Sequence, residues 1–223
     1  MAERECAVKP ARVVQFALLL VSVSSFVASQ DFRKFTFNVG GGVGIPVSDT
    51  ADLANVSGNA VVGGGVNFSP HIGFTGEFMW HGLPPSDQVL NAVIAPDGDA
   101  RLYSLTGNFI FRVKPQGKMG AYVIAGGGWY HRSWELTAPV LVPGTVCGPT
   151  FTWWGVACVN GLVPADAVLR DGSSNGGGFN VGGGITLGHE GSGPKFYTEV
   201  RYHHAYLNRV DAQVLPVTFG IRW

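Results

Sequence analysis

Charged side chains are scarce in this sequence. Lysine, arginine, aspartate and glutamate make up 13% of its 223 residues, and the formal net charge is zero. A domain that binds nucleic acid carries an excess of basic residues, so this composition argues against nucleic acid as a partner. The chain is nevertheless not of the disordered type, because aromatic residues reach 12% and supply apolar surface for a folded structure.

A complete dinucleotide-binding motif is also lacking. Five Gly-Gly-Gly runs interrupt the apolar segments, as in Phe37–Pro46 (FNVGGGVGIP). The motif needs Gly-x-Gly-x-x-Gly between a strand and a helix. Where the last glycine would fall, four of the runs have Ile45, Phe68, His131 and Leu187 instead. No helix-like apolar period follows these runs, so they do not predict a phosphate site.

Beyond residue 30 there is no run of 18 apolar residues, so the sequence predicts no membrane-spanning helix there. Instead, eight segments alternate between apolar and polar or small residues, each roughly the 9–11 residues that a tilted strand needs to cross a bilayer. In one of them Phe74 and Phe78 alternate with Thr75 and Glu77. This alternation, with a period of two residues, predicts β-strands that turn one face toward lipid.

The connections between these segments alternate in length. Short, turn-rich connections lie at 69–71, 114–118 and 189–194, and longer ones lie at 44–58, 82–99, 132–175 and 206–212. This order is typical of an outer-membrane barrel, which has tight periplasmic turns and larger outside loops. We therefore predict an all-β fold, an eight-stranded antiparallel up-and-down transmembrane β-barrel. A secreted β-sandwich is the alternative, since its strands also alternate.

Aromatic residues and glycines refine this prediction. Two aromatic girdles are expected, one with Phe35, Phe68, Phe111, Tyr122, Phe196 and Trp223, the other with Trp80, Tyr103, Tyr130, Phe179 and Tyr206. The interior of an eight-stranded barrel is barely wide enough for side chains. Small residues are therefore expected to face inward at Gly40, Gly42, Gly63, Gly65, Gly127, Gly182 and Gly184.

The N-terminus predicts export. Basic residues precede the apolar stretch 13–28, and the small residues Val27 and Ser29 favour cleavage before Gln30. We thus expect a signal peptide at 1–29 and the barrel domain at 30–223; an uncleaved anchor helix is the competing interpretation. In an oxidising compartment Cys147 and Cys158 are expected to form a disulfide, with two free thiols as the alternative.

Five charged residues take inward positions in the predicted strands: Glu77, Arg112, Glu199, Arg201 and Arg222. Charges at membrane depth must face the interior and pair. The sequence therefore predicts an ion-pair network that seals the lumen. Adjacent His203 and His204 fall on opposite faces of their strand, so they predict no metal site. No cofactor is expected.

Two tryptophans, Trp153 and Trp154, lie between the cysteines in the longest loop. An exposed aromatic pair is a candidate binding patch for an extracellular ligand. A disulfide-closed loop that packs on itself is the alternative.

The signal, the eight alternating segments and the phrases EVRYHH and PVTFGIRW resemble the small outer-membrane β-barrel proteins related to the OmpA transmembrane domain and OmpX. The resemblance covers about residues 31–223. It implies a place in the outer membrane of a Gram-negative bacterium, with lipopolysaccharide and the barrel assembly machinery as partners. The terminal Ile221 and Trp223 resemble the signal which that machinery reads, although Phe is its usual last residue.

The predicted function is a non-enzymatic outer-membrane protein with a structural or surface-interaction role. The rival is a lipid A deacylase on the same scaffold. That family places a serine two residues after a histidine on a late strand, but Ala205 and Tyr206 follow His203 and His204 here. Without a nucleophile the enzymatic function is not predicted.

Overall fold

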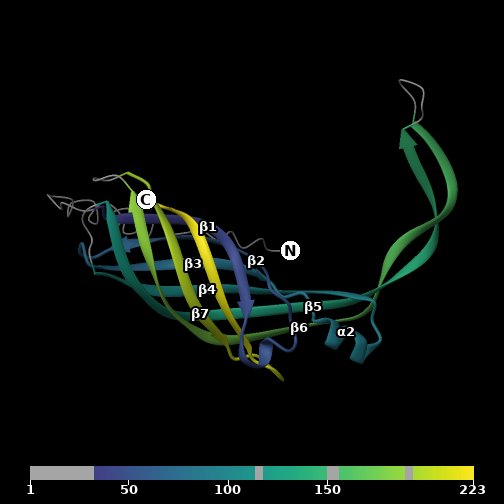
Figure 1. The fold of residues 1–223 in the computed structure, drawn as a ribbon, viewed down its shortest axis with the longest axis horizontal. Coiled ribbons are helices and arrows are strands. Elements are labelled where there is room, and N and C mark those ends of the chain that lie inside the picture. The colour runs from purple at the N-terminus through teal and green to yellow at the C-terminus, as the bar shows by residue number, and fades with distance from the viewer. Residues whose placement is uncertain (1–32, 114–117, 150–155, 189–192) are drawn as a thin grey trace, which may run out of the picture.

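The computed structural model describes residues 33–113, 118–149, 156–188 and 193–223 and shows a closed β-barrel with a hairpin projecting from one end (Figure 1). The expected signal peptide, residues 1–29, lies outside the described residues. Each strand pairs antiparallel with its neighbours in sequence, and β8 pairs with β1. Because this pairing closes the sheet into a ring, the eight-stranded barrel is confirmed and the β-sandwich alternative is wrong.

The eight strands differ in length because two of them continue beyond the barrel. Their bounds are β1 Phe35–Pro46, β2 Ser57–Asn67, β3 Ile72–Gly82, β4 Asp97–Arg112, β5 Met119–Pro149, β6 Val156–Gly188, β7 Lys195–Ala205 and β8 Ala212–Arg222. The connections contain a short 3-10 helix, Ser48–Thr50, and helix α2, Asp87–Val93. No helix among the described residues is long and apolar enough to cross a membrane.

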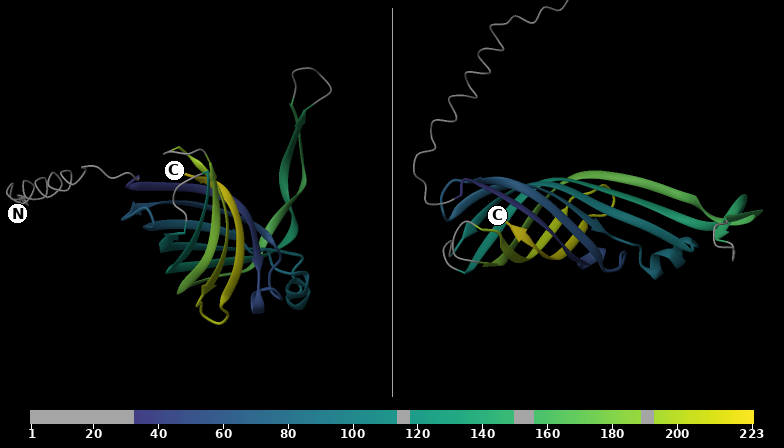
Figure 2. Two further views of the ribbon diagram at one scale, coloured as in Figure 1. Left: turned by 60° about the vertical axis from the view of Figure 1, so that its left-hand side comes forward. Right: turned by 90° about the horizontal axis from the view of Figure 1, so that it is seen from above.

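Alternation along the strands places apolar side chains outside and polar ones inside, as expected for seven of the eight segments. On β1, Phe35 and Phe37 are exposed while Thr36 and Asn38 are buried. The burial patterns of β3, β7 and β8 alternate in the same way, and further views show the strands as a ring (Figure 2). The result is an apolar outer belt of the kind that barrels turn toward lipid.

Strand β5 is oriented opposite to the expectation. Tyr122 and Tyr130 are buried inside the barrel, whereas Val123 and Trp129 are exposed on its outer surface. The two tyrosines therefore do not belong to the predicted girdles. Both faces of this segment are apolar, so its hydrophobic pattern did not determine which face points into the barrel. The tyrosine hydroxyl groups decide it, because buried hydroxyls need hydrogen-bond partners and find them inside.

The orientation of β5 also changes the inward glycines. Gly126 and Gly128 share the parity of Tyr122, and a Cβ at Gly126 would meet the inward Asn108 side chain and backbone. The expected inward position of Gly127 is wrong, since it shares the parity of Val123 and Trp129, which are exposed on the outer surface.

The expected loop at 132–175 is mostly β-structure. Strands β5 and β6 remain paired from Met119↔Leu187 at the barrel to Pro149↔Val156 at the far end, with a register shift at Leu136/Thr137. We call residues 138–149 and 156–167 the arm. The arm leaves the end of the barrel that carries the long connections and bends away from the barrel's long axis (Figures 1 and 2). A β-bulge bends a strand, and the register shift lies at the base of the arm.

Candidate functional site

Arg201 is the centre of the barrel interior. It lies on β7 and is 2% exposed, and its Nη1 donates to Glu77 Oε2 on β3 at 2.6 Å. Its Nη2 donates to Glu199 Oε1, two residues away on β7. Because β3 and β7 are opposite each other in the ring of eight, this guanidinium joins two walls of the barrel. A planar guanidinium with several donors suits such a double contact.

Three buried asparagines complete the shell around the Glu77 carboxylate. Asn38 Nδ2 donates to Oε1 at 3.1 Å and Asn108 Nδ2 donates to Oε2 at 2.8 Å. Asn180 in turn donates to Asn108 Oδ1 at 2.8 Å. These bonds matter because a buried carboxylate is stable only when it is paired and hydrogen-bonded.

Arg222 adds a second cation on β8. Its Nη2 lies 3.8 Å from Glu199 Oε2, which also accepts a hydrogen bond from the Tyr122 hydroxyl at 2.8 Å. The Arg222 guanidinium lies 4.7 Å and 4.8 Å from the ring centres of Tyr122 and Tyr197. Such contacts stabilise a desolvated cation.

Four of the five charged residues proposed from the sequence are therefore brought together: Glu77, Glu199, Arg201 and Arg222. The Nη2 of Arg112 donates instead to Asn67 Oδ1 at 2.8 Å. The alternation identified the charged members of this cluster. It missed Tyr122 and Tyr197. Tyr122 could have been found only by knowing which face of β5 points inward, and both faces of that strand are apolar.

The glycine runs make room for this cluster. A Cβ on Gly63 would lie 2.6 Å from Glu77 Cγ, and one on Gly184 would lie 2.5 Å from the Tyr122 hydroxyl oxygen. Neither neighbour can move freely, because both belong to the hydrogen-bonded network. The glycines thus allow large polar side chains to fill a narrow barrel.

Replacing Gly184 with alanine is expected to lower the free energy of unfolding by about 1–3 kcal/mol, the usual cost of overpacking an interior. The new methyl group would also approach the Thr198 carbonyl oxygen to 2.6 Å. Gly161→Ala is the matched control, since a Cβ there meets nothing within 4 Å. Urea unfolding in detergent micelles measures both. Equal stability of the two variants would contradict the crowding described here.

Apolar clusters lie on either side of the polar centre. Toward the end with the long connections, eight residues pack together: Ala54, Leu83, Leu102, Tyr130, Ala205, Leu207, Ala212 and Val214. Toward the other end, Ile110, Tyr122 and Ile124 form a smaller cluster. Packed apolar side chains thus close off the polar centre toward both ends of the described barrel.

The two adjacent histidines point to opposite faces, as their spacing predicts. His203 is buried, lies 5.5 Å from His81 between ring centres, and its Nδ1 is 3.0 Å from the Tyr130 hydroxyl. Within the described ranges, no group of three or more histidine, cysteine or acidic residues is placed to hold a metal ion.

His204 lies on the outer surface and stacks on Phe179, with 5.5 Å between ring centres. Its Nε2 is 3.2 Å from Asp211 Oδ2, and its Nδ1 is 3.2 Å from the Tyr202 hydroxyl. A histidine with an acidic partner is therefore present near the long-connection end. Among the described residues no serine hydroxyl is hydrogen-bonded to it, so a Ser-His-Asp arrangement is not assembled there.

The remaining predicted site residues lie at the far ends of the molecule. Cys147 and Cys158 form a disulfide across the arm, with their Cα atoms 4.0 Å apart. Trp153 and Trp154 lie outside the described residues. Trp223 exchanges two backbone hydrogen bonds with Phe37, at 2.7 Å and 2.9 Å, and Ile221 pairs with Val39, so both contribute to closing β8 onto β1.

Comparison of the sequence with known protein families and with curated proteins gives no match. Solved structures are similar. Neisserial surface protein A shares 14% identity, with 84% of this chain and 95% of that chain covered and a TM-score of 0.57. Ail, the attachment invasion locus protein of Yersinia pestis, shares 14% identity over 86% and 100% of the chains, with a TM-score of 0.45. The N-terminal barrel domain of Pseudomonas aeruginosa OprF shares 11% identity over 86% and 98%, with a TM-score of 0.41.

The overlap with Neisserial surface protein A spans nearly all of that barrel and most of this chain. Together with the closed ring of strands, it makes clear that this chain has the fold of the small outer-membrane β-barrel proteins, the group that its sequence resembles.

Proposed function

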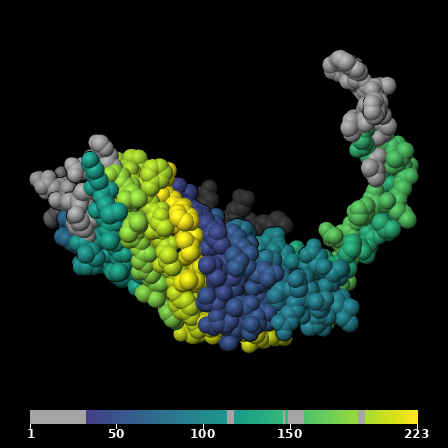
Figure 3. All heavy atoms as spheres, viewed as in Figure 1, coloured from purple at the N-terminus to yellow at the C-terminus, as the bar shows by residue number. Residues whose placement is uncertain are grey.

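We propose that this chain is a non-enzymatic outer-membrane protein whose filled barrel anchors the arm outside the cell as an interaction surface. The observation that carries the proposal is the contrast between the two parts. The barrel interior is closed by an ion-paired centre and apolar clusters, while the arm carries a single charged residue among those described, Asp166 at its base, and stands clear of the barrel (Figure 3). A closed barrel with a long projecting element favours display over transport.

The placement in the membrane rests on the outer belt. Its exposed residues include Val39, Val62, Phe78, Leu105, Phe109, Val123, Val181, Val200 and Phe219. This surface suits hydrocarbon, and closure leaves no unpaired strand edge within the barrel. The short turns then face the periplasm, and the long connections and the arm face outside.

Partners follow from this placement. The outer leaflet brings lipopolysaccharide against the belt, and the barrel assembly machinery would read the end of β8 at Ile221 and Trp223. An extracellular ligand would meet the arm. Lipid A modification is not favoured, because His204 and Asp211 have no serine nucleophile bonded to them in the described part of the chain.

Two readouts on cells that make the chain test the proposal. On a denaturing gel, the unboiled protein is expected to migrate differently from the boiled protein, because a closed barrel resists detergent. Proteinase K added to intact cells is expected to cut within the arm and leave the barrel whole. A soluble protein without a heat-dependent shift, or an arm cut only after the outer membrane is opened, would overturn the proposal.

A further inference from the structure

We infer that the arm is a pairing element for a second copy of this chain, through the outer edge of β6 at residues 156–162. The inference rests on the proposed function, because it takes the arm to lie outside the membrane. It starts from the composition of the arm. No charged residue lies between Glu135 and Asp166, and Leu141, Val159 and Leu162 are each more than half exposed.

Both strands of the arm have a free edge. Within the described residues, β5 pairs with β4 only as far as Thr137, and β6 pairs with β7 only from Gly178 onward. In the arm the two strands therefore pair with each other alone. A two-stranded hairpin is marginally stable in water, and an uncharged free edge is a template for another strand.

Prolines distinguish the two edges. Pro139, Pro143 and Pro149 on β5 are separated by even numbers of residues, so their nitrogen atoms point toward the same edge. Pro164 on β6 pairs with Leu141 and belongs to the same set of residue pairs. Since the ladder between β5 and β6 is continuous here, the missing N–H groups fall on the outer edges.

The disulfide supports this assignment. Cys147 and Cys158 belong to the same set of pairs, and their Cα atoms are 4.0 Å apart. Antiparallel pairs that do not exchange backbone hydrogen bonds have the shorter Cα separation, about 4.5 Å against about 5.5 Å. The backbone groups of these residues therefore point outward.

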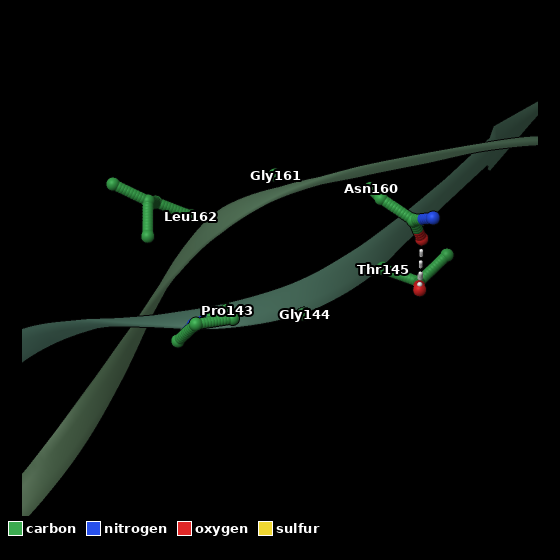
Figure 4. Close-up of a pocket in the computed structure, with 6 residues that line it drawn as sticks. All are labelled: Pro143, Gly144, Thr145, Asn160, Gly161 and Leu162. Atoms are coloured by element: carbon green, nitrogen blue, oxygen red, sulfur yellow. Dashed lines mark hydrogen bonds between the residues drawn. The ribbon is translucent and has the colours of Figure 1, made fainter.

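It follows that the outer edge of β5 is interrupted by proline, whereas β6 offers outward N–H and C=O groups at four alternate residues. These are Val156, Cys158, Asn160 and Leu162, with no proline or charge among them. Figure 4 shows part of this segment, including the hydrogen bond of 2.6 Å from Thr145 to Asn160 that ties the two strands together.

The segment is complementary to itself. An antiparallel pair of β6 edges centred on Val159 sets Cys158 opposite Asn160 and Val156 opposite Leu162 of the other copy. All four resulting pairs exchange backbone hydrogen bonds, about eight in total. Such an isologous contact closes as a dimer.

The bend of the arm makes this pairing compatible with one membrane. Two barrels in the same membrane stand side by side with parallel axes. Because each arm bends away from its barrel axis (Figure 1), the two arms can run toward each other and lie antiparallel. A second copy is thus favoured over an unrelated partner, since both the edge and the geometry are supplied by this chain.

Leu162→Pro and Leu141→Pro form a matched pair of variants. The two leucines are 62% and 65% exposed, and both positions belong to the set of pairs that already accommodates prolines in the arm. The first change removes a donor from the β6 edge and the second removes one from the β5 edge. The hairpin ladder is retained in both.

Sedimentation of the full chain in detergent, over a range of protein concentrations, is expected to show a monomer–dimer equilibrium. Leu162→Pro should raise the dimer dissociation constant at least about tenfold. Two backbone hydrogen bonds are lost per dimer, and the proline rings lie between the two β6 edges. Leu141→Pro should leave that constant within about twofold. A wild-type chain that stays monomeric, or equal weakening by both variants, would refute the inference.

Hydrogen exchange in lipid bilayers supplies an independent readout. The amides of Asn160 and Leu162 should become protected as protein density rises, while those of Leu141 and Thr145 exchange freely. Protection that does not depend on protein density would assign the arm to the lipid surface instead and overturn the dimer. A monomeric chain that retains the heat-dependent shift and the protease-sensitive arm would refute only this inference, not the proposed function.

Discussion

Replacing Arg201 with methionine is expected to destabilise the barrel by about 3–5 kcal/mol, the usual effect of removing one partner from a buried ion pair. The reason is that Glu77 and Glu199, both 2% exposed, would each lose their closest cation. Equilibrium unfolding by urea in lipid vesicles, followed by tryptophan fluorescence, measures the change in the free energy of unfolding.

Two controls distinguish the loss of the buried ion pairs from a nonspecific effect of the substitution on stability. Adding Glu77→Gln to the Arg201→Met variant should restore part of the lost stability, because the one remaining carboxylate, Glu199, still has Arg222 as its cation and no uncompensated charge is left in the cluster. Arg101→Met breaks the exposed ion pair with Asp99 and should have no measurable effect. If Arg201→Met were as harmless as Arg101→Met, the central role of the lumen cluster would be disproved.

The second large effect is expected on the outer belt. Leu105→Lys should lower the free energy of unfolding in a bilayer by about 2–4 kcal/mol, the cost of a lysine at the lipid midplane of a barrel. Leu105 is 57% exposed and lies near the middle of 101–111, the stretch of β4 that pairs with β3. Unfolding measurements in vesicles test this value.

Leu141→Lys provides the matched control. Leu141 is 65% exposed, but it lies on the arm, which we place in water. The same substitution should therefore leave barrel stability nearly unchanged there. A similar loss at both positions would argue that the arm contacts lipid, and no loss at either would remove the evidence that the belt faces hydrocarbon.

The sequence predicted the inward and outward faces wherever polarity alternates. Asn38, Glu77, Asn108, Glu199 and Arg201 all fall inside as their parity requires. The reason is that side chains alternate strictly along a strand. When one face is apolar and faces lipid, the residues of the other face must point into the barrel. The charges of the lumen cluster follow from the same rule.

Strand β5 shows where that rule stops. Apolar and aromatic residues occupy both of its faces, so either orientation satisfies the pattern. The choice depends on contacts across the barrel, such as the hydrogen bond from Tyr122 to Glu199, which are far apart in sequence. No local signal reports such contacts.

The arm shows a second limit. Its residues 138–149 and 156–167 do not alternate cleanly between polar and apolar, because neither of its faces covers a core. Their β-structure comes from pairing with each other and from the Cys147–Cys158 link. That pairing extends β5 and β6 beyond the barrel, so the segment expected to be a loop is a long two-stranded hairpin.

By itself the sequence determined the barrel class, the number of strands and the polarity of most faces, because these depend on a period of two residues and on turn composition. The tertiary structure alone decided which charges meet, which way β5 faces and that the long connection is a bent arm. The first two features depend on the closure of β8 onto β1, which brings together residues from opposite sides of the ring. The arm depends on the continued pairing of β5 with β6 beyond the barrel.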